Sequence, residues 1–493
     1  MNKALTILLL FVFLPFSIKS QNESRKDIVQ YKVETFGSIA HKSTTPFWIN
    51  SGSYGIVPLE ANNVYLRGSI IGNYYFNQNL SLEAGVDLIE RSKFDPSFFV
   101  QQLYASLSFK ALKLSIGSKE DYHSMLDQEL SSGDFSFSTN ARPIPEINLS
   151  VPKFTYVPFT KKVLQFKGDF AVGKFMDNNY IKDTKRENVA YTQNILLHHK
   201  SLFLLLEDPT RRFPFYMILG FEDCAQWGGW SSRKDVGGDL PQSIKDFFKV
   251  VFFSSGDSNA PEGEQMNTLG NHLGTYNLKF GYKHSSFELA VYKQHFFEDL
   301  SGIEYANWKD GIWGLECKLF NQSFLKKILV EYIHTMDQSG PFHFPFGEVP
   351  SNIDARIGGG DNYYNHGLYT TGWSYFGNAI GSPLLTSPKY NEDNSLGFKN
   401  TRIKAWHLGL SGNLLSNFSY RILGTTMRGY GTLYYPFTKR SHTVSGLIEC
   451  KYSYPKWKGW ELGLQIAADK GTMYGNNIGG SLKITKTGNI WSN

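Results

Sequence analysis

Apolar and polar residues alternate along most of this chain, with the period of two that is typical of β-strands whose faces meet different surroundings. One face of residues 164–173 carries Leu164, Phe166, Phe170 and Val172, and the opposite face carries Gln165, Lys167, Asp169 and Gly173. The apolar face of residues 460–469 consists of Trp460, Leu462, Leu464, Ile466 and Ala468. Its opposite face consists of Glu461, Gly463, Gln465, Ala467 and Asp469.

About eighteen such runs lie between Tyr31 and Ile484, separated by Gly, Asn, Asp, Ser or Pro. A soluble sandwich of this size would divide into domains, and no linker divides this chain. We therefore predict the all-β class, as one large antiparallel transmembrane β-barrel of about 18 strands with short helical insertions. Its apolar face would meet lipid and its polar face water or inserted loops, while closure satisfies the backbone hydrogen bonds within the bilayer.

Aromatic residues at the ends of the runs are typical of the interfacial girdles of such barrels. We assign Tyr434, Tyr435, Trp457 and Trp460 to these girdles. The alternative interpretation is aromatic core packing in a soluble β protein.

Two regions interrupt the β pattern, and we expect both to fold over or into the barrel mouth. Residues 240–256 place five apolar side chains at helical spacing, with Asp239 or Ser243 as an N-cap. These five are Ile244, Phe247, Phe248, Val251 and Phe252. Residues 119–149 are polar and contain a Pro-Ile-Pro turn.

The first twenty residues have the layout of a secretory signal peptide. Lys3 precedes an apolar run that ends at Phe16, and cleavage is expected after Ser20. An uncleaved anchor is the alternative, but the run is shorter than the roughly 20 residues that span a bilayer. We predict an exported chain with one barrel domain over residues 21–493 and with long loops at 119–149, 228–272 and 336–400.

Composition excludes several other classes of protein. A net charge of +6 over 493 residues is too weak a bias for nucleic-acid binding. The three cysteines, Cys224, Cys317 and Cys450, are too far apart for a disulfide scaffold or a Cys-based zinc site. The aromatic share of 15% and the 46 glycines are the stronger deviations from an ordinary globular chain.

The segment 358–381, GGGDNYYNHGLYTTGWSYFGNAIG, combines rings, amides and glycines. In a loop at a barrel mouth, rings can stack on sugars while amides and a carboxylate bind hydroxyl groups. The candidate sugar-binding residues here are Asp361, Asn362, Tyr363, Tyr364, Trp373 and Tyr375. The alternative is that these rings pack the loop against other loops and plug the lumen.

Other candidates for sugar binding lie outside this segment. Trp227 and Trp230 flank two glycines and would be exposed at a rim, where anchoring to the membrane interface is an alternative role. Arg142, Arg356 and Arg428 could grip acidic sugars bidentately, although arginines that pair with luminal carboxylates are as common.

No catalytic or metal-binding motif is present, so we predict no enzyme activity, no cofactor and no metal. His198 and His199 are adjacent in a strand, so their side chains point to opposite faces and cannot share a metal. A barrel enzyme such as a phospholipase would need a Ser/His set at one end. Ser124 beside His123 and Ser441 beside His442 show no supporting motif.

Five segments, in order, resemble the Wzi family of capsule-assembly outer-membrane proteins, in the form found in Bacteroidetes-type bacteria. They are QQLYASLSFKALKLSIGSKE (101–120), NARPIPEINLS (140–150), LLHHKSLFL (196–204), GFEDCAQWGG (220–229) and KAWHLGLSGNL (404–414). The resemblance implies an eighteen-stranded outer-membrane barrel with helical elements near its periplasmic side. It also implies a surface lectin that holds capsular polysaccharide on the cell, in a family not known for catalysis.

Our interpretation is a monomeric outer-membrane barrel, surrounded by lipid, that binds exported capsular or other surface polysaccharide at its outer face. It would not bind nucleic acid. A porin that passes sugars is the main alternative, but it needs an open lumen, and the aromatic insertions suggest obstruction.

Overall fold

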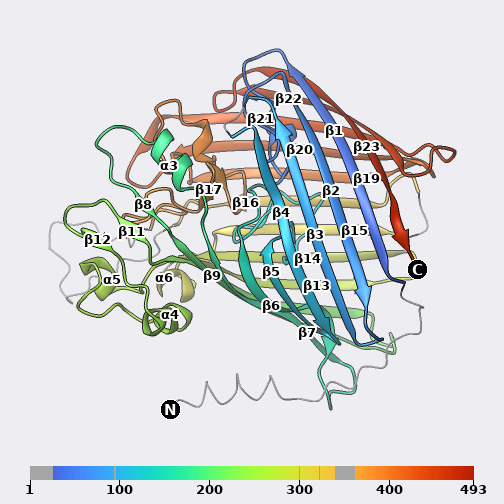
Figure 1. Ribbon diagram of the computed structural model, residues 1–493, viewed down its shortest axis with the longest axis horizontal. Coiled ribbons are helices and arrows are strands. Elements are labelled where there is room, and N and C mark those ends of the chain that lie inside the picture. Colours follow the sequence, from blue (N-terminus) through green and yellow to red (C-terminus); the bar gives the residue numbers. More distant parts are fainter. Residues whose placement is uncertain (1–25, 94–95, 299, 321–322, 339–360) are drawn as a thin grey trace.

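The structure is a computed structural model and describes residues 26–93, 96–298, 300–320, 323–338 and 361–493. The predicted signal peptide, residues 1–20, and the candidate Arg356 lie outside these residues. The described chain forms one large barrel with irregular segments gathered at one end (Figure 1).

Eighteen antiparallel strands form the barrel wall. The first nine are β1 (Ile28–Ala40), β2 (Asn63–Tyr75), β3 (Leu80–Arg91), β4 (Phe98–Phe109), β5 (Leu112–Ser118), β6 (Glu146–Tyr156), β7 (Leu164–Lys174), β9 (Leu196–Glu207) and β10 (Phe215–Trp227). The others are β13 (Asn271–Lys283), β14 (Phe287–Phe297), β15 (Gly311–Leu319), β16 (Lys327–His334), β19 (Ile403–Leu415), β20 (Phe418–Gly431), β21 (Pro436–Tyr452), β22 (Trp460–Gly471) and β23 (Asn477–Ser492).

Pairing between the first and last strands closes the barrel. β1 runs antiparallel to β23 from Ile28 opposite Ser492 to Ala40 opposite Gly479. Within the described residues, each of the eighteen strands pairs with a neighbour on both sides, so the sheet has no free edge that would expose backbone groups to lipid. The predicted all-β barrel of about 18 strands is confirmed.

The alternating pattern of the sequence corresponds to the two faces of the wall. On β22, Leu462, Leu464 and Ile466 are exposed on the outside, whereas Ala467 and Asp469 are buried on the luminal side. Outward apolar side chains continue around the wall, which gives the barrel its lipid-facing surface.

The two ends of the barrel differ in the length of their connections. At the end where β1 begins and β23 ends, which we call the turn end, the connections span two to seven residues. The opposite end, which we call the loop end, carries all the long connections, among them 41–62, 119–145, 228–270 and 335–402. Short turns are periplasmic and long loops extracellular in barrels of this type, so we assign the loop end to the cell exterior.

Every helix of the described chain belongs to a loop-end connection. These are α2 (Phe47–Asn50), α3 (Asn178–Thr184), α4 (Ile244–Val251), α5 (Glu262–Met266), α6 (Leu300–Ile303) and the 3₁₀ turn η1 (Pro388–Tyr390). The expectation of helical elements near the periplasmic side is therefore wrong for this chain. The turn-end connections are too short to contain a docked helix, and only the long loops have room for one.

The helix expected within residues 240–256 is confirmed as α4. Ser243 is its N-cap, and a capping box with Asp246 satisfies backbone donors at the start of the helix. The helix ends at Val251, one residue before the last apolar residue of the pattern, Phe252.

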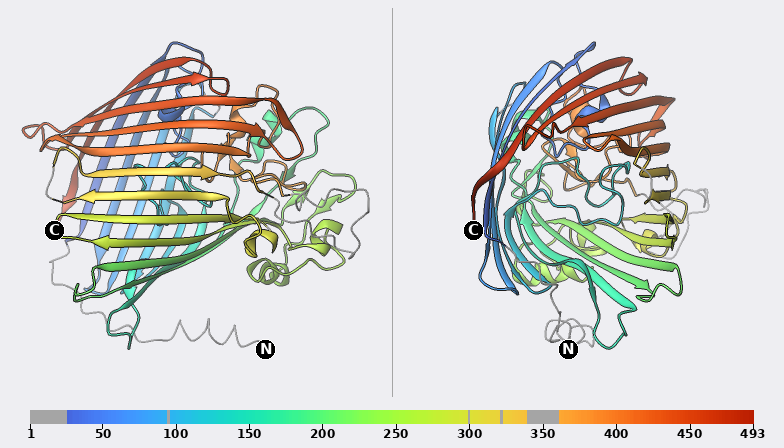
Figure 2. Two further views of the ribbon diagram at one scale, coloured as in Figure 1. Left: turned by 180° about the vertical axis from the view of Figure 1, so that it is seen from behind. Right: turned by 90° about the vertical axis from the view of Figure 1, so that its right-hand side faces the viewer.

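Three loop-end segments, residues 41–62, 119–145 and 361–402, enter the lumen, and we call them the plug. Trp48 Nε1 donates to Thr425 Oγ1 on the luminal face of β20 at 3.1 Å. His407, on β19, bonds the Leu130 carbonyl through Nε2 at 2.7 Å. Figure 2 shows these segments inside the ring of strands. The plug supplies the hydrophobic core of a barrel too wide for its wall side chains to fill.

Glu331 on β16 is a main attachment between the wall and the plug. It is fully buried, and its carboxylate accepts hydrogen bonds from Ser132 N at 2.8 Å, from Ser131 Oγ at 2.9 Å and from Tyr292 OH at 2.6 Å. A charged acceptor shared by three donors, two of them buried and one half-buried, is costly to remove, because each donor then loses its partner.

We predict that Glu331→Ala lowers the free energy of unfolding by on the order of 3 kcal/mol, because three donors, two of them buried, lose their acceptor. The measurement is urea unfolding of the refolded barrel, followed by its shift in electrophoretic mobility. Glu304→Ala, at an exposed glutamate in the loop that carries α6, is the control and should leave the midpoint unchanged. Equal midpoints for both variants would contradict the assignment.

Candidate functional site

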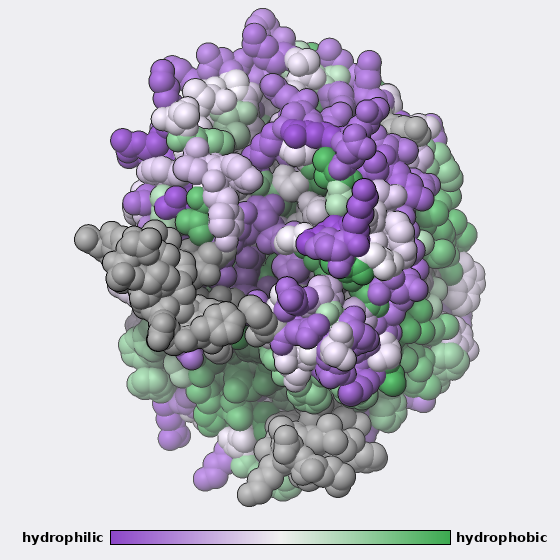
Figure 3. Space-filling view, turned by 90° about the vertical axis from the view of Figure 1, so that its left-hand side faces the viewer, coloured by the Kyte–Doolittle hydropathy of each residue, from purple (hydrophilic) through white to green (hydrophobic). Residues whose placement is uncertain are grey.

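A groove lies in the loop end of the barrel, and we call it the outer groove. Four segments line it, with residues 233–240, 259–272, 361–368 and 432–435, together with Glu298 and Phe398. Its volume is about 1270 Å³. Figure 3 looks onto this end and shows a recess bordered largely by hydrophilic side chains. The volume exceeds the range of roughly 300–1,000 Å³ that is usual for small-ligand pockets, so the groove has room for several sugar units.

Amide, carboxylate and imidazole groups from residues 361–366 form one side of the groove. Asp361 and Asn362 are half-buried and line it. Asn365 is held in place, because its amide donates to the Phe398 carbonyl at 3.0 Å and its Oδ1 accepts from Phe398 N at 2.8 Å. Burial, together with the nearby His272 and Arg233, lowers the pKa of His366 to about 4, so this ring is neutral at physiological pH.

Two exposed rings lie on another side of the groove. Tyr434 is 60% exposed and Tyr435 82% exposed, in the four-residue connection between β20 and β21. We had assigned this pair to an interfacial girdle. Because the connection lies at the loop end and lines the groove, both rings can also offer an apolar face to a bound sugar.

Arg233 links two of the loops that line the outer groove. Its guanidinium pairs with Asp235 and donates from Nη1 to the Gly367 carbonyl at 3.1 Å. This arginine was not among the predicted site residues. Its position between loops that are far apart in sequence is a tertiary feature that spacing along the chain does not show.

The predicted rings of the 358–381 segment are buried in the plug. Tyr363, Tyr364, Trp373 and Tyr375 are all less than 4% exposed. Trp373 Nε1 donates to the Ser136 carbonyl at 2.7 Å, and Tyr364 OH donates to the Phe135 carbonyl at 2.7 Å. These rings have no face available to a sugar, so the sugar-stacking interpretation does not fit their positions. The alternative, that they pack the loop against other loops, does.

Glycines let these rings approach the backbone closely. At Gly381, an added Cβ would lie 2.0 Å from Tyr364 Oη and 2.1 Å from the Phe135 carbonyl oxygen. The backbone of Gly372 has a φ of +60°, in the left-handed region that suits glycine. The combination of glycines and rings in this segment therefore serves packing of the plug.

The remaining candidates lie apart from the groove. The Arg142 guanidinium sits 4.0 Å from the Phe99 ring centroid and 4.6 Å from that of Phe376, and burial lowers its pKa. Trp227 is buried, whereas Trp230 is partly exposed. Arg428 is exposed on β20. Of the predicted site residues within the described chain, Asp361 and Asn362 alone line the outer groove.

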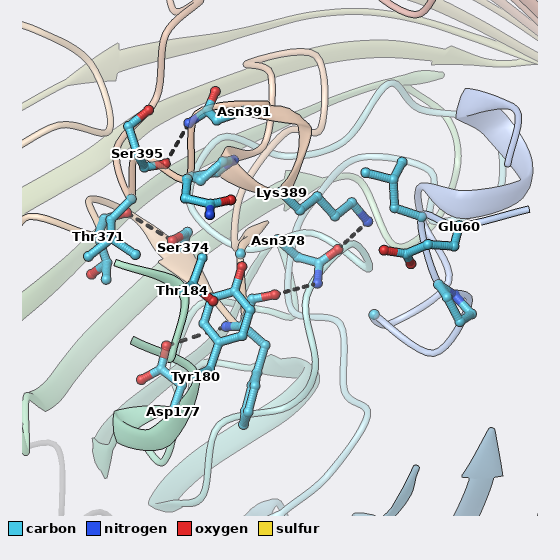
Figure 4. A pocket seen from close by; sticks show the side chains of 18 of the residues that line it. Glu60, Asp177, Tyr180, Thr184, Thr371, Ser374, Asn378, Lys389, Asn391 and Ser395 are labelled. Carbon is cyan, nitrogen blue, oxygen red and sulfur yellow. Dashed lines mark hydrogen bonds between the residues drawn. The ribbon is translucent and has the colours of Figure 1, made fainter. Parts of the chain in front are cut away.

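A smaller cavity of about 150 Å³ lies between α3 and the plug (Figure 4). Lys389 Nζ donates to Asn378 Oδ1 at 2.5 Å, and Asp177 Oδ2 accepts from Phe376 N at 3.3 Å. Burial raises the pKa of Asp177 to about 7, while burial and the nearby Arg91 lower the pKa of Lys389 to about 7. The cavity is below the usual size of a ligand pocket, so the outer groove is the better candidate for polymer binding.

Within the described parts of the chain, no group of three or more His, Cys, Asp or Glu side chains is placed to hold a metal ion. Among the helices of those same ranges, none is long and apolar enough to cross a membrane.

The fold and the site together define a class: a closed β-barrel of the outer-membrane type whose lumen is plugged and whose mouth carries a polar groove. Residues 37–386 match the family model described as Capsule assembly protein Wzi. Because this match covers well over half of the chain, the chain belongs to the Wzi capsule-assembly family and is an outer-membrane protein. The predicted family is confirmed, while the Bacteroidetes-type form stays a prediction.

The comparison with solved structures gives matches at low sequence identity. Wzi of Escherichia coli, described as an outer-membrane, carbohydrate-binding β-barrel involved in group 1 capsule assembly, is 12% identical. The alignment covers 92% of this chain and 83% of that chain, with a TM-score of 0.54. Pseudomonas aeruginosa OccK3 is 9% identical over 94% of this chain and 96% of that chain, with a TM-score of 0.48. No curated protein sequence matches this chain.

We predict that Asp177→Asn reduces the dependence of stability on pH. The unfolded carboxyl titrates near 3.8 and the folded one near 7, so the folded state binds the proton more tightly. Stability is therefore lost as pH rises from about 4 through about 7, and the variant lacks this loss. Unfolding midpoints across this range test it, with Asp183→Asn, at an exposed position in α3, as the control. A wild-type midpoint that rises over this range would contradict the assignment.

Proposed function

We propose that this chain is a lectin-like barrel that binds exported capsular polysaccharide in the outer groove and so retains it on the cell surface. The observation that carries the proposal is the outer groove itself, which opens at the loop end of a barrel from the Wzi capsule-assembly family. The carbohydrate binding described for the Escherichia coli relative supports the same role.

The groove offers the groups that sugar recognition requires. Tyr434 and Tyr435 present exposed rings that can cover the apolar face of a pyranose. Asp361 and Asn362 provide acceptors and donors for hydroxyl groups. The Arg233 guanidinium lies beside them, paired with Asp235, and its remaining N–H groups can donate to sugar oxygens.

Binding in this proposal is non-covalent and multivalent. A single groove contacts few sugar units and holds them weakly, but a repeating polymer engages many barrels at a high effective concentration. The proposal needs no cofactor and no catalytic step. It treats the barrel as a monomer surrounded by outer-membrane lipid, with no nucleic-acid partner.

The plug weighs against a sugar-permeable porin, because loop segments bonded to the wall occupy the lumen. The contacts of the two serines that neighbour a histidine in the sequence weigh against a barrel enzyme. Ser124 is bonded to Asp134, and Ser441 Oγ accepts from Gly429 N at 3.1 Å, so neither of these bonds joins a serine to its neighbouring histidine.

We predict that Tyr434→Ala/Tyr435→Ala moves polysaccharide from the cell-bound fraction into the culture medium while the total is unchanged. Loss of about 1.4 kcal/mol of ring–sugar contact corresponds to roughly tenfold weaker binding per groove. The measurement is polysaccharide in both fractions from strains that carry the wild type, the variant or a deletion of the gene.

Phe159→Ala is the matched control, since this fully exposed ring lies in a turn-end connection at the opposite end of the barrel. It should retain polymer as the wild type does. Normal retention in the deletion strain would remove the capsule role altogether. Normal retention in the double variant alone would move the binding site away from the groove rings.

A further inference from the structure

Protein covers part of the outer surface of the barrel wall at the loop end. Residues 243–256, which contain α4, form one such cover, and we call them the rim segment. They lie over β7, β9, β10 and β13. The rings of Phe247 and Phe170 contact at 6.2 Å between centroids, and the Phe253 ring lies 5.0 Å from that of His272.

The strand register shows that this contact surface is the outside of the wall. Phe170 lies opposite Leu149 and Lys200, and Lys200 lies opposite Asp223. Paired residues share a face, and Leu149 is exposed on the lipid side, so Lys200 and Asp223 also face outward. His198 faces the same way, while His199 points into the lumen and bonds Glu146 and Asp169. The predicted opposite orientation of these two histidines is confirmed.

Beneath the rim segment lies an ionic cluster that would be costly to expose to lipid. Lys200 Nζ is 2.6 Å from Asp223 Oδ2, and His272 Nδ1 is 3.1 Å from Asp223 Oδ1. Asp223 and His272 are almost fully buried. Charged groups on the wall of a barrel near the bilayer need such cover and pairing.

The same cluster fixes the orientation of α4. Lys200 Nζ donates to the Val251 carbonyl at 2.9 Å, where a cation also interacts favourably with the helix C-terminus. On the wall side, Val250 is fully buried, and the Phe247 ring lies 5.6 Å from that of Trp227. One side of the helix is therefore held against the barrel, and its opposite side faces away.

The side that faces away is apolar. Ile244, Phe248 and Phe252 follow one another at intervals of four residues, and they are 77%, 51% and 48% exposed. Four-residue spacing places these side chains on one stripe of a helix. Figure 3 shows hydrophobic surface gathered on the lower flank of the loop end, the side where Figure 1 places α4.

This stripe is continuous with the lipid-facing band of the barrel. On β9, the next outward residue toward the turn end is the exposed Leu202, and on β10 the exposed Leu219 follows the half-buried Phe221. Leu202 is two residues from Lys200, or about 7 Å along the strand. The apolar side of α4 therefore lies at the edge of the band that the bilayer covers.

We propose that the rim segment is an interfacial membrane anchor, whose Ile244, Phe248 and Phe252 side chains insert into the outer leaflet of the surrounding membrane. The occupant of this surface is lipid, as for other amphipathic helices that lie in the interface with their apolar face buried. The anchor seals the Lys200–Asp223–His272 cluster from lipid. It also holds the 228–270 loop, parts of which line the outer groove, at a fixed height above the membrane.

A nitroxide spin label at Phe248→Cys tests this in the full barrel reconstituted into phosphatidylcholine vesicles. The background carries Cys224→Ala, Cys317→Val and Cys450→Val, since all three cysteines are free. Leu202→Cys is the lipid-exposed reference, and Lys234→Cys, in the same loop, is the water-exposed reference. We expect the ratio of oxygen to nickel-chelate collision rates at 248 to match that at 202 and to exceed that at 234 several-fold.

A ratio at 248 equal to that at 234 would overturn the proposal, because the helix would then face water. Spin–spin broadening that grows with the protein-to-lipid ratio would also overturn it, in favour of a second copy of the chain. If Phe248→Cys does not refold, Ile244→Cys on the same stripe gives the same test. Polysaccharide binding plays no part in this experiment, so its outcome is independent of the proposed function.

Discussion

Pairing of β1 with β23 is the interaction on which the rest of the structure depends. Backbone groups in a bilayer have no water to bond, so the sheet must close on itself. Closure turns the alternating sequence into an apolar outside and a polar lumen. It also confines irregular structure to the two ends, and the short turn-end connections leave the loop end as the place where loops can form a site.

A barrel of eighteen strands leaves an interior that wall side chains cannot fill, and the plug is the consequence of that width. Its hydrogen bonds to luminal groups such as Glu331 and His407 stabilise loops that would otherwise lack a core. Because the plug occupies the lumen, the chemistry available to a large ligand lies on top of it, in the outer groove. Lipid contact by the rim segment would hold one wall of that groove in place.

The sequence predicted the strands well, because a period of two is a local property that the bilayer enforces on both faces. The start of α4 also depends on residues close in the sequence, because Ser243 and Asp246 form its capping box.

The site was harder to predict. Composition cannot tell whether Trp373 turns toward a ligand or toward Ser136, since both outcomes need rings and hydrogen bonds. The sequence of Tyr434 and Tyr435 fits an interfacial girdle equally well, and only the folded connection shows that both line the outer groove.

The central claim is that this barrel works through its mouth and not as a pore. Conductance of the purified protein in a planar lipid bilayer tests it most directly, with a variant in which a flexible Gly-Ser linker replaces residues 124–136 of the plug as the open control. We expect the intact barrel to be silent and the control to conduct. Stable large current steps from the folded, intact barrel would contradict the claim and would favour a sugar-permeable porin.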